Sequence, residues 1–254
     1  IRHEGPRVPS EPHIEMSVSM LRAAGVDVRA DAAPLATGGA MRRRIWRVLP
    51  GPIRPGEIAV EPDLSNAVPF LAAALATGGE VTVADWPADS LQPADRIIGL
   101  LRSMGADVRL TNEGLRVSGS GRISGVGADL SEVSEVAPVL TALAALASSP
   151  SEFTGIGHMR RHESDRLAAL ASEIGKLGGD VTELADGLRI RPAPLRGGAT
   201  FNSHDDHRLV MAAAVLGLVT DGVRVQNAAT VGKTFPDFSQ RWSEILTPAA
   251  QSAS

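Results

Sequence analysis

The 254-residue sequence has no cysteine, and its longest apolar runs are short. The absence of cysteine excludes disulfide bonds, thiolate metal sites and a cysteine nucleophile, and it fits a cytoplasmic protein. The apolar runs at 136–147 and 209–219 are too short to cross a bilayer. No charged segment followed by an apolar one opens the sequence, so a signal peptide is not expected. We therefore expect a cytoplasmic protein without a membrane partner.

Neither sign of charge is in large excess, because 25 Lys and Arg oppose 29 Asp and Glu, for a net charge of −4. With 43% hydrophobic residues, this is the composition of a globular chain with room for one large domain or two. The three arginines at 42–44 are too few for a nucleic-acid-binding patch and are expected in an exposed loop. The sequence opens on Ile1 in mid-pattern, so we expect a fragment or a processed product.

A Pro- and Gly-rich segment at residues 49–56 is the clearest linker. Before it, the segment Ser-Glu-Pro-His that begins at Ser10 is typical of a helix start, and residues 16–24 have helical apolar spacing. Gly25 is expected to end this helix, before a strand at 26–28. Residues 1–56 therefore predict a helix–strand unit separate from residues 57–254.

After the linker, a pattern recurs about every seventy residues. Leu-Arg-Ser-Met-Gly-Ala-Asp-Val at 101–108 matches Ile-Gly-Lys-Leu-Gly-Gly-Asp-Val at 174–181, and each precedes a hairpin whose second strand begins Gly-Leu-Arg. An Ala-rich helix and a short strand come before each of these. The repeat is thus strand–helix–strand–helix–strand–strand (βαβαββ), and the last copy stops after its second helix at 238–246.

Such self-similarity predicts an α/β (α+β) domain with pseudo-threefold symmetry, whose helices pack into one core. The Ala-rich helices are expected at residues 67–77, 136–148 and 209–219. The three repeats are expected at about 57–121, 122–194 and 195–249.

Polar segments at 158–166, 205–208 and 233–237 interrupt the apolar background. Arg166, Arg208 and Lys233 offer positive charges to a phosphate or carboxylate. Acidic neighbours can orient these cations or transfer protons. Those neighbours are Glu163, Asp165, Asp205 and Asp206.

Each segment alone has a simpler interpretation. The Glu163/Arg166 pair would be a helix cap with a solvated ion pair, and the segment at 205–208 a cap with an acidic first turn. His158 and His162 have the i, i+4 spacing of metal ligands on a helix. The stretch before Ser164 is instead expected to be a loop with no third ligand, so no metal site is predicted. Recurrence at matching places in successive repeats favours one shared site at one end of the domain.

Three of these segments resemble, in order and spacing, signature segments of the 5-enolpyruvylshikimate-3-phosphate synthase family. They are His-Glu-Ser-Asp-Arg-Leu at 162–167, Asp-His-Arg-Leu-Val-Met-Ala at 206–212 and Lys-Thr-Phe-Pro-Asp-Phe at 233–238. The helix start at Ser10 and residues 61–67 are also similar to that family. The resemblance spans the chain but covers only the C-terminal part of the family's length. It implies an enolpyruvyl transferase-like, two-domain enzyme in which residues 1–56 are a remnant of the N-terminal substrate domain and residues 57–254 are the C-terminal domain.

The resemblance also implies an activity. Members transfer the enolpyruvyl group of phosphoenolpyruvate to the 5-hydroxyl of shikimate 3-phosphate and release phosphate, on the route to chorismate and the aromatic amino acids. No metal or organic cofactor is implied, no nucleic-acid partner is expected, and the full-length enzyme is expected to be a monomer.

The resemblance assigns roles to single residues. Arg166, Arg208 and Lys233 would hold phosphoenolpyruvate. Glu135 would contact shikimate 3-phosphate and take the proton of its 5-hydroxyl, and Glu163 would be the second proton-transfer carboxylate. The remaining matches to shikimate 3-phosphate contacts are Ser10, His158 and His162.

The sequence departs from the family pattern at three of these positions. Many members have Asp at the position of Glu135, Lys at that of His162 and an amide at that of His158. Glu135 keeps the carboxylate chemistry at longer reach, whereas His162 replaces a permanent charge with a titratable one, so substrate affinity is expected to depend more on pH.

Two alternatives stay open. One is a UDP-N-acetylglucosamine enolpyruvyl transferase, whose C-terminal segments match less well. The other is a non-catalytic fragment or binding module of the same fold, and the coding frame upstream of Ile1 would distinguish it. The chain alone is expected to be inactive because half of the substrate site is lacking.

Overall fold

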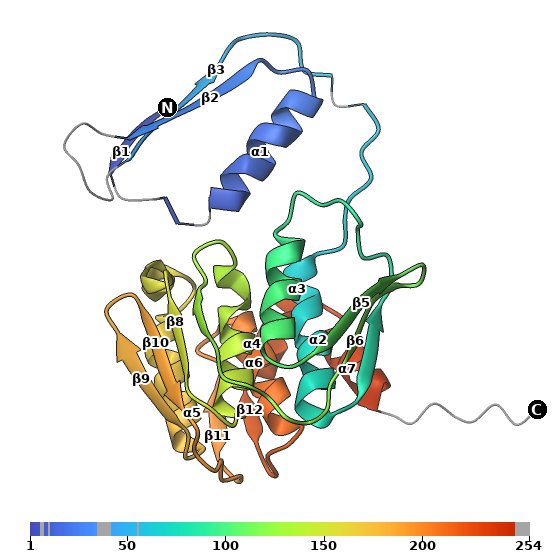
Figure 1. Cartoon of the computed structure of the whole chain (residues 1–254), viewed down its shortest axis with the longest axis vertical. Helices are drawn as coiled ribbons and strands as arrows, with labels where there is room; N and C mark the ends of the chain where they lie inside the picture. The colour runs from blue at the N-terminus through green and yellow to red at the C-terminus, as the bar shows by residue number, and fades with distance from the viewer. Residues whose placement is uncertain (6–7, 10, 35–41, 55, 247–254) are drawn as a thin grey trace, which may run out of the picture.

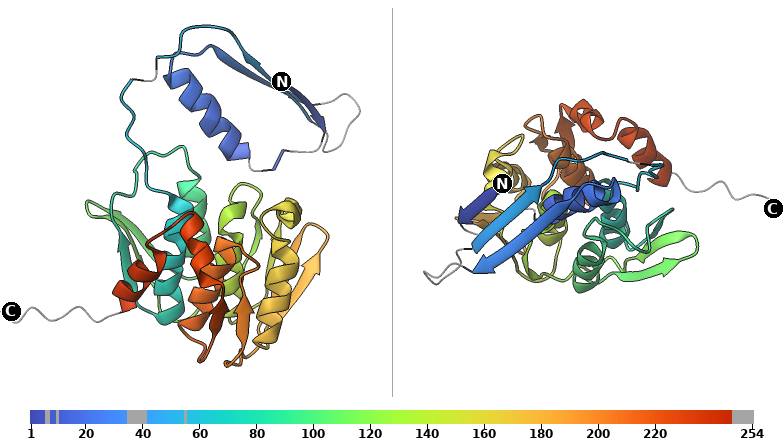
Figure 2. Two further views of the ribbon diagram at one scale, coloured as in Figure 1. Left: turned by 180° about the vertical axis from the view of Figure 1, so that it is seen from behind. Right: turned by 90° about the horizontal axis from the view of Figure 1, so that it is seen from above.

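The computed structural model describes residues 1–5, 8–9, 11–34, 42–54 and 56–246 (Figure 1). They form a small N-terminal unit (residues 1–48) and a larger C-terminal unit (residues 64–246), joined by a crossover whose described residues form no helix or strand (Figures 1 and 2). The expected linker lies within this crossover. None of the helices in the described ranges is long and apolar enough to cross a membrane.

The N-terminal unit is one helix on one face of a three-stranded antiparallel sheet (Figure 1). The sheet has the order β1-β3-β2, with β1 at Arg2–Gly5, β2 at Val28–Pro34 and β3 at Arg42–Val48. Helix α1 (Glu11–Ala23) begins and ends close to the predicted positions. Gly25 follows it with a φ of 82°, the left-handed conformation that favours glycine after a helix. The unit buries one small apolar cluster, formed by Val18, Val26, Val28 and Trp46.

The three arginines at 42–44 begin strand β3, so the expected exposed loop is wrong. The register places Arg44 between His3 of β1 and Ala32 of β2. Its guanidinium forms an ion pair with Glu11 of α1. Pairing with two neighbouring strands and with a carboxylate on the covering helix therefore fixes a segment that looked like a solvated charge run.

The C-terminal unit repeats one order of elements three times, so the pseudo-threefold enolpyruvyl transferase-like fold is confirmed, although only the second copy has the full βαβαββ order and the first has no opening strand among the described residues. The first contains α2 (Leu64–Thr77), β4 (Glu80–Val83), α3 (Ala94–Ser103), β5 (Asp107–Thr111) and β6 (Gly114–Ser118). The second contains β7 (Gly127–Asp129), α4 (Ala137–Ala145), β8 (Ser151–Thr154), α5 (Arg166–Lys176), β9 (Asp180–Leu184) and β10 (Gly187–Arg191). The third contains β11 (Thr200–Asn202), α6 (His207–Gly217), β12 (Arg224–Gln226) and α7 (Phe238–Leu246). Short 3-10 helices are η1 (Ser134–Val136), η2 (Gly157–Arg161) and η3 (Ala228–Lys233).

Helices α2, α4 and α6 contact one another at the centre of this unit, and the sheets surround them (Figures 1 and 2). Their sequences are apolar on nearly every face, which is the pattern of a fully buried helix. The sheets are β4-β6-β5, β7-β8-β10-β9 and β11-β12. All three central helices begin at the end of the unit that faces α1 (Figure 1).

The two hairpins share a glycine for one physical reason. A Cβ atom on Gly114 would lie 2.0 Å from the carbonyl oxygen of Val83, and one on Gly187 would lie 1.8 Å from that of Phe153. In both repeats the second hairpin strand passes so close to the repeat's preceding strand that only glycine fits. The Gly-Leu-Arg segments match in sequence because in each repeat the backbone at the glycine lies close to the backbone of the preceding strand.

Candidate active site

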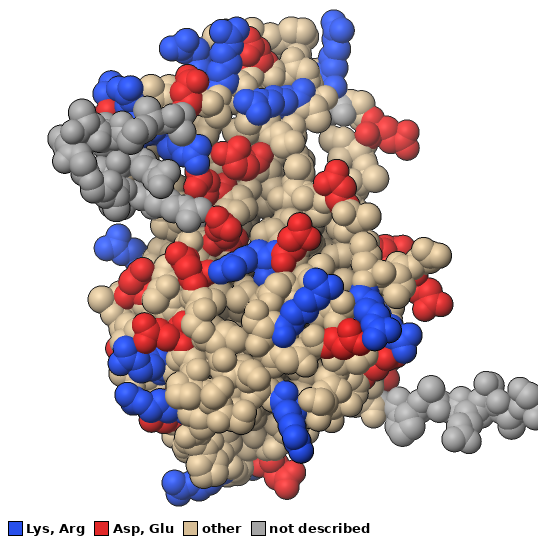
Figure 3. All heavy atoms as spheres, in the orientation of Figure 1, with Lys and Arg blue, Asp and Glu red and all other residues tan. Residues whose placement is uncertain are grey.

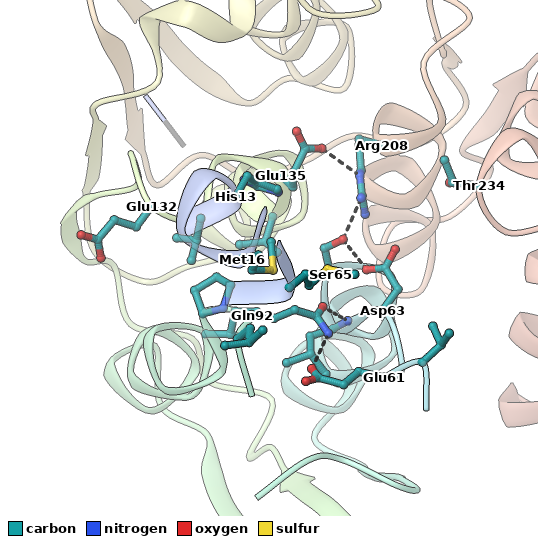
Figure 4. A pocket seen from close by; sticks show the side chains of 18 of the residues that line it. His13, Met16, Glu61, Asp63, Ser65, Gln92, Glu132, Glu135, Arg208 and Thr234 are labelled. Carbon is teal, nitrogen blue, oxygen red and sulfur yellow. Dashed lines mark hydrogen bonds and ion pairs between the residues drawn. The ribbon is translucent and has the colours of Figure 1, made fainter. Parts of the chain in front are cut away.

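A cleft of about 700 Å³ lies between α1 and the N-terminal ends of the central helices (Figure 4). Helix α1 contributes His13, Met16 and Met20. The polar lining residues of the opposite wall are Glu61, Asp63, Ser65, Gln92, Glu132, Glu135, Glu163, His207, Arg208 and Thr234. Each of the three repeats supplies part of this wall, so the cleft is where the pseudo-threefold arrangement brings distant polar segments together.

Arg166 is the centre of the charged network at this wall, and its side chain is 0% exposed. Asp165 caps helix α5 by accepting the N–H of Ala168 at 3.0 Å, so Arg166 stands at the first turn. The guanidinium donates to Asp206 at 2.7 Å, to Glu163 at 2.7 Å and to Glu135 at 3.2 Å. The simpler interpretation of a solvated ion pair is therefore wrong for Arg166.

Arg208 joins residues from all three repeats. Its Nη2 donates to Ser65 Oγ at 2.7 Å and its Nε lies 3.3 Å from Glu135 Oε2 (Figure 4). Its Nη1 donates to Asn66 Oδ1 at 3.0 Å. The residue is only 6% exposed, and that exposed part lines the cleft. Asp206 caps the helix on which Arg208 stands, accepting the Arg208 N–H at 2.9 Å. The cap predicted from the sequence is therefore present, but it is buried and also binds Arg166.

Two carboxylates of this network are held ionised. Burial alone would raise the pKa of Glu135, but the charges of Arg166 and Arg208 outweigh it and hold that pKa below its usual value. Burial likewise opposes ionisation of Asp206, and the hydrogen bond and charge of Arg166 hold its pKa low. Both side chains are therefore anions at neutral pH, each in contact with a cation.

The imidazoles form the rim of the network. His162 Nδ1 lies 3.0 Å from Arg166 Nη1, and because a guanidinium can only donate, Nδ1 accepts in this contact. The His158 ring packs edge-on against His162, with centroids 5.3 Å apart. His158 lies in η2 (Gly157–Arg161), whereas residues 162–164 form bends, so the loop expected before Ser164 is wrong only for residues 157–161. Burial lowers the pKa of His158 and the pKa of His207, and neighbouring positive charge adds to both effects.

The structure brings together Arg166, Arg208, Glu135, Glu163 and His162, with His158 beside them. Lys233 is separate from these contacts: its exposed side chain donates to the backbone carbonyl of Asp205 at 2.7 Å. Ser10 lies outside the described residues. Within the described ranges, no group of three or more His, Asp or Glu side chains could hold a metal ion.

Sequence reasoning missed several polar contacts of the cleft. Ser65 and Asn66 are the hydrogen-bond acceptors of Arg208, although in the sequence residues 61–67 were noted only for their similarity to the family and given no role in the site. His207 is 4% exposed and lines the cleft, with no hydrogen bond to its buried Nδ1. The signal that could have found them is the repeat itself, because equivalent helix starts must meet at one end of the domain.

On the face drawn in Figure 3, acidic and basic side chains are interspersed across both units. A surface that binds a polyanion needs a continuous band of cations. Among the described residues many charges form local pairs, such as Arg160 with Glu183 at 2.6 Å. The arrangement suits a small anion in a local pocket.

Comparison with known proteins agrees with this geometry. Residues 1–242 match the profile of the family described as EPSP synthase (3-phosphoshikimate 1-carboxyvinyltransferase). The 3-phosphoshikimate 1-carboxyvinyltransferase of Kocuria rhizophila is 48% identical over 247 residues, which are 97% of this chain and 53% of that protein. The chain thus spans about half the length of this relative.

Solved structures show a similar arrangement. The EPSP synthase of Acinetobacter baumannii aligns with a TM-score of 0.71 at 25% identity, over 96% of this chain and 56% of that one. The enolpyruvyl transferase NikO of Streptomyces tendae aligns with a TM-score of 0.67 at 18% identity, over 96% of this chain and 55% of that one. At 18% identity the likeness to NikO shows a shared fold.

Proposed function

Because the chain belongs to the EPSP synthase family, we propose that it is the part of such an enzyme that holds phosphoenolpyruvate. The reaction is transfer of the enolpyruvyl group to the 5-hydroxyl of shikimate 3-phosphate, with release of phosphate. Residues 57–254 would form the C-terminal domain, with repeats at about 57–121, 122–194 and 195–249. Residues 1–56 would belong to the N-terminal substrate domain. We place the enzyme in the cytoplasm and expect a monomer at full length.

The observation that carries this proposal is the position of Glu135 between two arginines at the wall of the cleft. Arg166 Nη1 lies 3.2 Å and Arg208 Nε lies 3.3 Å from the same oxygen, Oε2 of Glu135. Two cations on one carboxylate leave it ionised but weakly basic. A substrate anion that binds the arginines would draw them from Glu135 and raise its affinity for a proton. Glu135 would then be suited to take the proton of the attacking hydroxyl once the substrates are bound.

Glu163 offers the complementary group. The addition puts the hydroxyl oxygen on C2 of phosphoenolpyruvate and a proton on the methylene carbon, so it needs an acid as well as a base. Glu163 contacts Arg166 through one oxygen, and its side chain is 42% exposed at the cleft. It is therefore in a different environment from Glu135, which favours different proton affinities for the two carboxylates.

The charge of the site supports the need for a second half. Phosphoenolpyruvate carries about 2.5–3 negative charges at neutral pH. Arg166 and Arg208 are already paired with Glu135, Glu163 and Asp206. Lys233 adds one cation, so we propose that further cations come from the part of the relatives that this chain does not cover. Ser10, His158 and His162 would contact shikimate 3-phosphate, and neither metal nor organic cofactor takes part.

The test is phosphate release by the purified 254-residue chain with both substrates, alone and after mixing with the N-terminal portion of a relative. The chain alone should not turn over, because proximity between bound substrates contributes about 7–11 kcal/mol to barrier lowering. The mixture should regain activity. Turnover by the chain alone at an ordinary enzymatic rate would contradict the proposal.

In the active mixture, Arg208→Ala should raise the phosphoenolpyruvate concentration at half saturation by about tenfold or more, because a charge-assisted contact worth about 1.5–3 kcal/mol is lost. The matched control is Arg189→Ala, which removes an exposed arginine paired with Glu152 on a neighbouring strand. The control should leave saturation unchanged. An unchanged value for Arg208→Ala would remove Arg208 from the site.

A further inference from the structure

The turn at residues 203–206, between β11 and α6, has an unusual backbone. His204 and Asp205 both have positive φ, at 51° and 57°, and the N–H of Asp206 donates to the carbonyl of Ser203 at 2.9 Å. Two successive non-glycine residues in this region are disfavoured, because their Cβ atoms crowd the backbone. Asn227, which contacts the turn, has a φ of 55°. Three of the four non-glycine residues with positive φ in the described ranges therefore belong to one local network.

Such a backbone persists only where its surroundings hold it. Glu173 of helix α5 holds the near side of the turn, because its carboxylate accepts the N–H of Asn202 at 2.9 Å and contacts His204 Nε2 at 3.0 Å. On the far side, the amide of Asn227 donates to the carboxylate of Asp205. Side chains from two different elements thus fix the turn.

Glu173 is a buried anion with no part in the proposed chemistry. It is 1% exposed, and its carboxylate also accepts two contacts from Lys176 Nζ at 2.7 Å. Burial would raise the pKa of Glu173, but its bonds with Lys176, the Asn202 N–H and His204 hold that pKa low. A buried, ionised carboxylate that contacts both the Asn202 N–H and His204 indicates that the turn's position matters.

The turn binds two of the cations of the candidate site, Lys233 and Arg166. The carbonyl of Asp205 accepts Lys233 Nζ at 2.7 Å, and the carboxylate of Asp206 holds Arg166 at 2.7 Å. Arg166 and Glu173 stand on the same helix, α5. The helix therefore contacts the turn twice, and Lys233 is attached to the turn between those contacts.

We infer that Glu173 and His204 are positioning residues: their contact holds the turn at residues 203–206, and through it holds Lys233 in a fixed place relative to Arg166. The geometric part of this inference concerns the turn and Lys233 alone. Its consequence for phosphoenolpyruvate rests on the proposed function. Neither residue is expected to touch the substrate.

The sequence offers a direct probe, because Lys176 and Lys233 are the two lysines of the chain and both end in this network. Acetylation of each lysine by a succinimidyl ester can be followed separately by peptide mass spectrometry. In Glu173→Gln both lysines should react faster, since Lys176 loses its ion pair and Lys233 loses a fixed acceptor. In His204→Asn only Lys233 should react faster, by about two- to tenfold, the factor expected for one hydrogen bond.

The matched control is Glu152→Gln, which breaks an exposed ion pair in the same repeat and should change neither rate. His204 is partly exposed, so His204→Asn should fold even if Glu173→Gln does not. If Lys233 reacts at the wild-type rate in His204→Asn, the inference is overturned. The same holds if Glu173→Gln folds and speeds acetylation of Lys176 alone.

A second measurement separates the inference from the proposed function. Phosphoenolpyruvate saturation in the mixture with the N-terminal portion should weaken several-fold in His204→Asn, while shikimate 3-phosphate saturation stays unchanged. Faster acetylation of Lys233 with unchanged phosphoenolpyruvate saturation would support the positioning contact and contradict the role proposed for Lys233. An equal loss for both substrates would overturn a specific effect on the cations.

Discussion

The two units bury apolar surface in different ways, although each is built from helices on sheets. In the N-terminal unit one helix covers one sheet, four of the described residues form the buried cluster, and Met20 and Leu21 of α1 are 56% and 37% exposed. In the C-terminal unit three copies close around one another, so α2, α4 and α6 are covered on every side. A repeat unit that cannot bury its own apolar face needs its neighbours. Both units use helices packed on sheets, so the size of the buried core depends more on the number of repeat copies in a unit than on the kind of element.

The units also differ in charge. Residues 1–56 have nine arginines and five acidic residues, whereas residues 57–254 have sixteen Lys and Arg and twenty-four Asp and Glu. The cleft between the units is lined by several carboxylates from the C-terminal unit, among them Glu132 and Glu163. Opposite net charges on the two sides attract within about 8 Å at physiological salt. The charge asymmetry therefore favours the two units approaching each other across the cleft.

The largest expected effect tests whether the two cores are separate. Phe153 is 0% exposed in the large core, and Phe153→Ala should lower the free energy of unfolding of the C-terminal unit by about 3–5 kcal/mol. Trp46→Ala removes the largest side chain of the small cluster in the N-terminal unit. It should leave the stability of the C-terminal unit unchanged, because Trp46 is not part of the large core. Hydrogen exchange of peptides from α4 and from β2 measures each unit. Equal loss in both units from either substitution would mean that the cores unfold together.

Local patterns made much of the large unit predictable from the sequence. Helix α7 has the predicted bounds, and both hairpins form where the Gly-Leu-Arg segments indicated. Each of these depends on periodicity or on one close backbone approach. The enolpyruvyl transferase-like fold followed from the repeat together with the family resemblance. The arginines of β3 were missed because a strand depends on its partners, which for Arg44 include Glu11 on another element.

The sequence indicated which charged residues belong to the site, but not which residues bind and bury them. Arg166 next to Glu163 has the pattern of a solvated helix start, and its buried partner, Asp206, is forty positions away. The acceptors of Arg208 lie more than 140 positions away, on α2. Ser and Asn at a helix start also have ordinary capping roles. Only the packing of the three repeats makes Ser65 and Asn66 part of the site.

A smaller effect, with a distinct pH dependence, concerns the buried pair of the C-terminal unit. The pKa of Asp206 is lower in the folded chain than its ordinary value of 3.8, so this pair stabilises fully above that value. As pH falls below about 3.8, the unfolded chain takes up the proton first, and the contribution is lost toward the lower folded pKa. Asp206→Asn should cost about 1.5–3 kcal/mol at pH 7, because a charged hydrogen bond is weakened.

The measurement is urea unfolding of the C-terminal unit between pH 7 and pH 2, for the wild type and for Asp206→Asn. The difference between the two proteins should shrink as pH falls, because protonation removes in the wild type what the substitution removes already. The matched control is Asp180→Asn, which changes an exposed carboxylate 3.7 Å from Arg191. A difference that stays constant down to pH 2 would mean that Arg166 does not hold Asp206 ionised.

The smallest expected effect concerns the N-terminal unit, which has the smaller buried cluster. Glu11 pairs with Arg44 between α1 and β3, and the two side chains are 16% and 25% exposed. Glu11→Gln should therefore lower the free energy of unfolding of the N-terminal unit by about 0.5–1 kcal/mol.

The control, Glu152→Gln, breaks the exposed pair with Arg189 on the larger unit, and there the free energy of unfolding should change by no more than about 0.5 kcal/mol. Because the small cluster has four buried residues among those that the structure describes, one ion pair is a larger share of what holds that unit together. Hydrogen exchange of β2 and β3 peptides in Glu11→Gln, against β8 and β10 peptides in Glu152→Gln, decides it. Equal protection changes in the two variants would show that the small unit depends on its ion pair no more than the large one does.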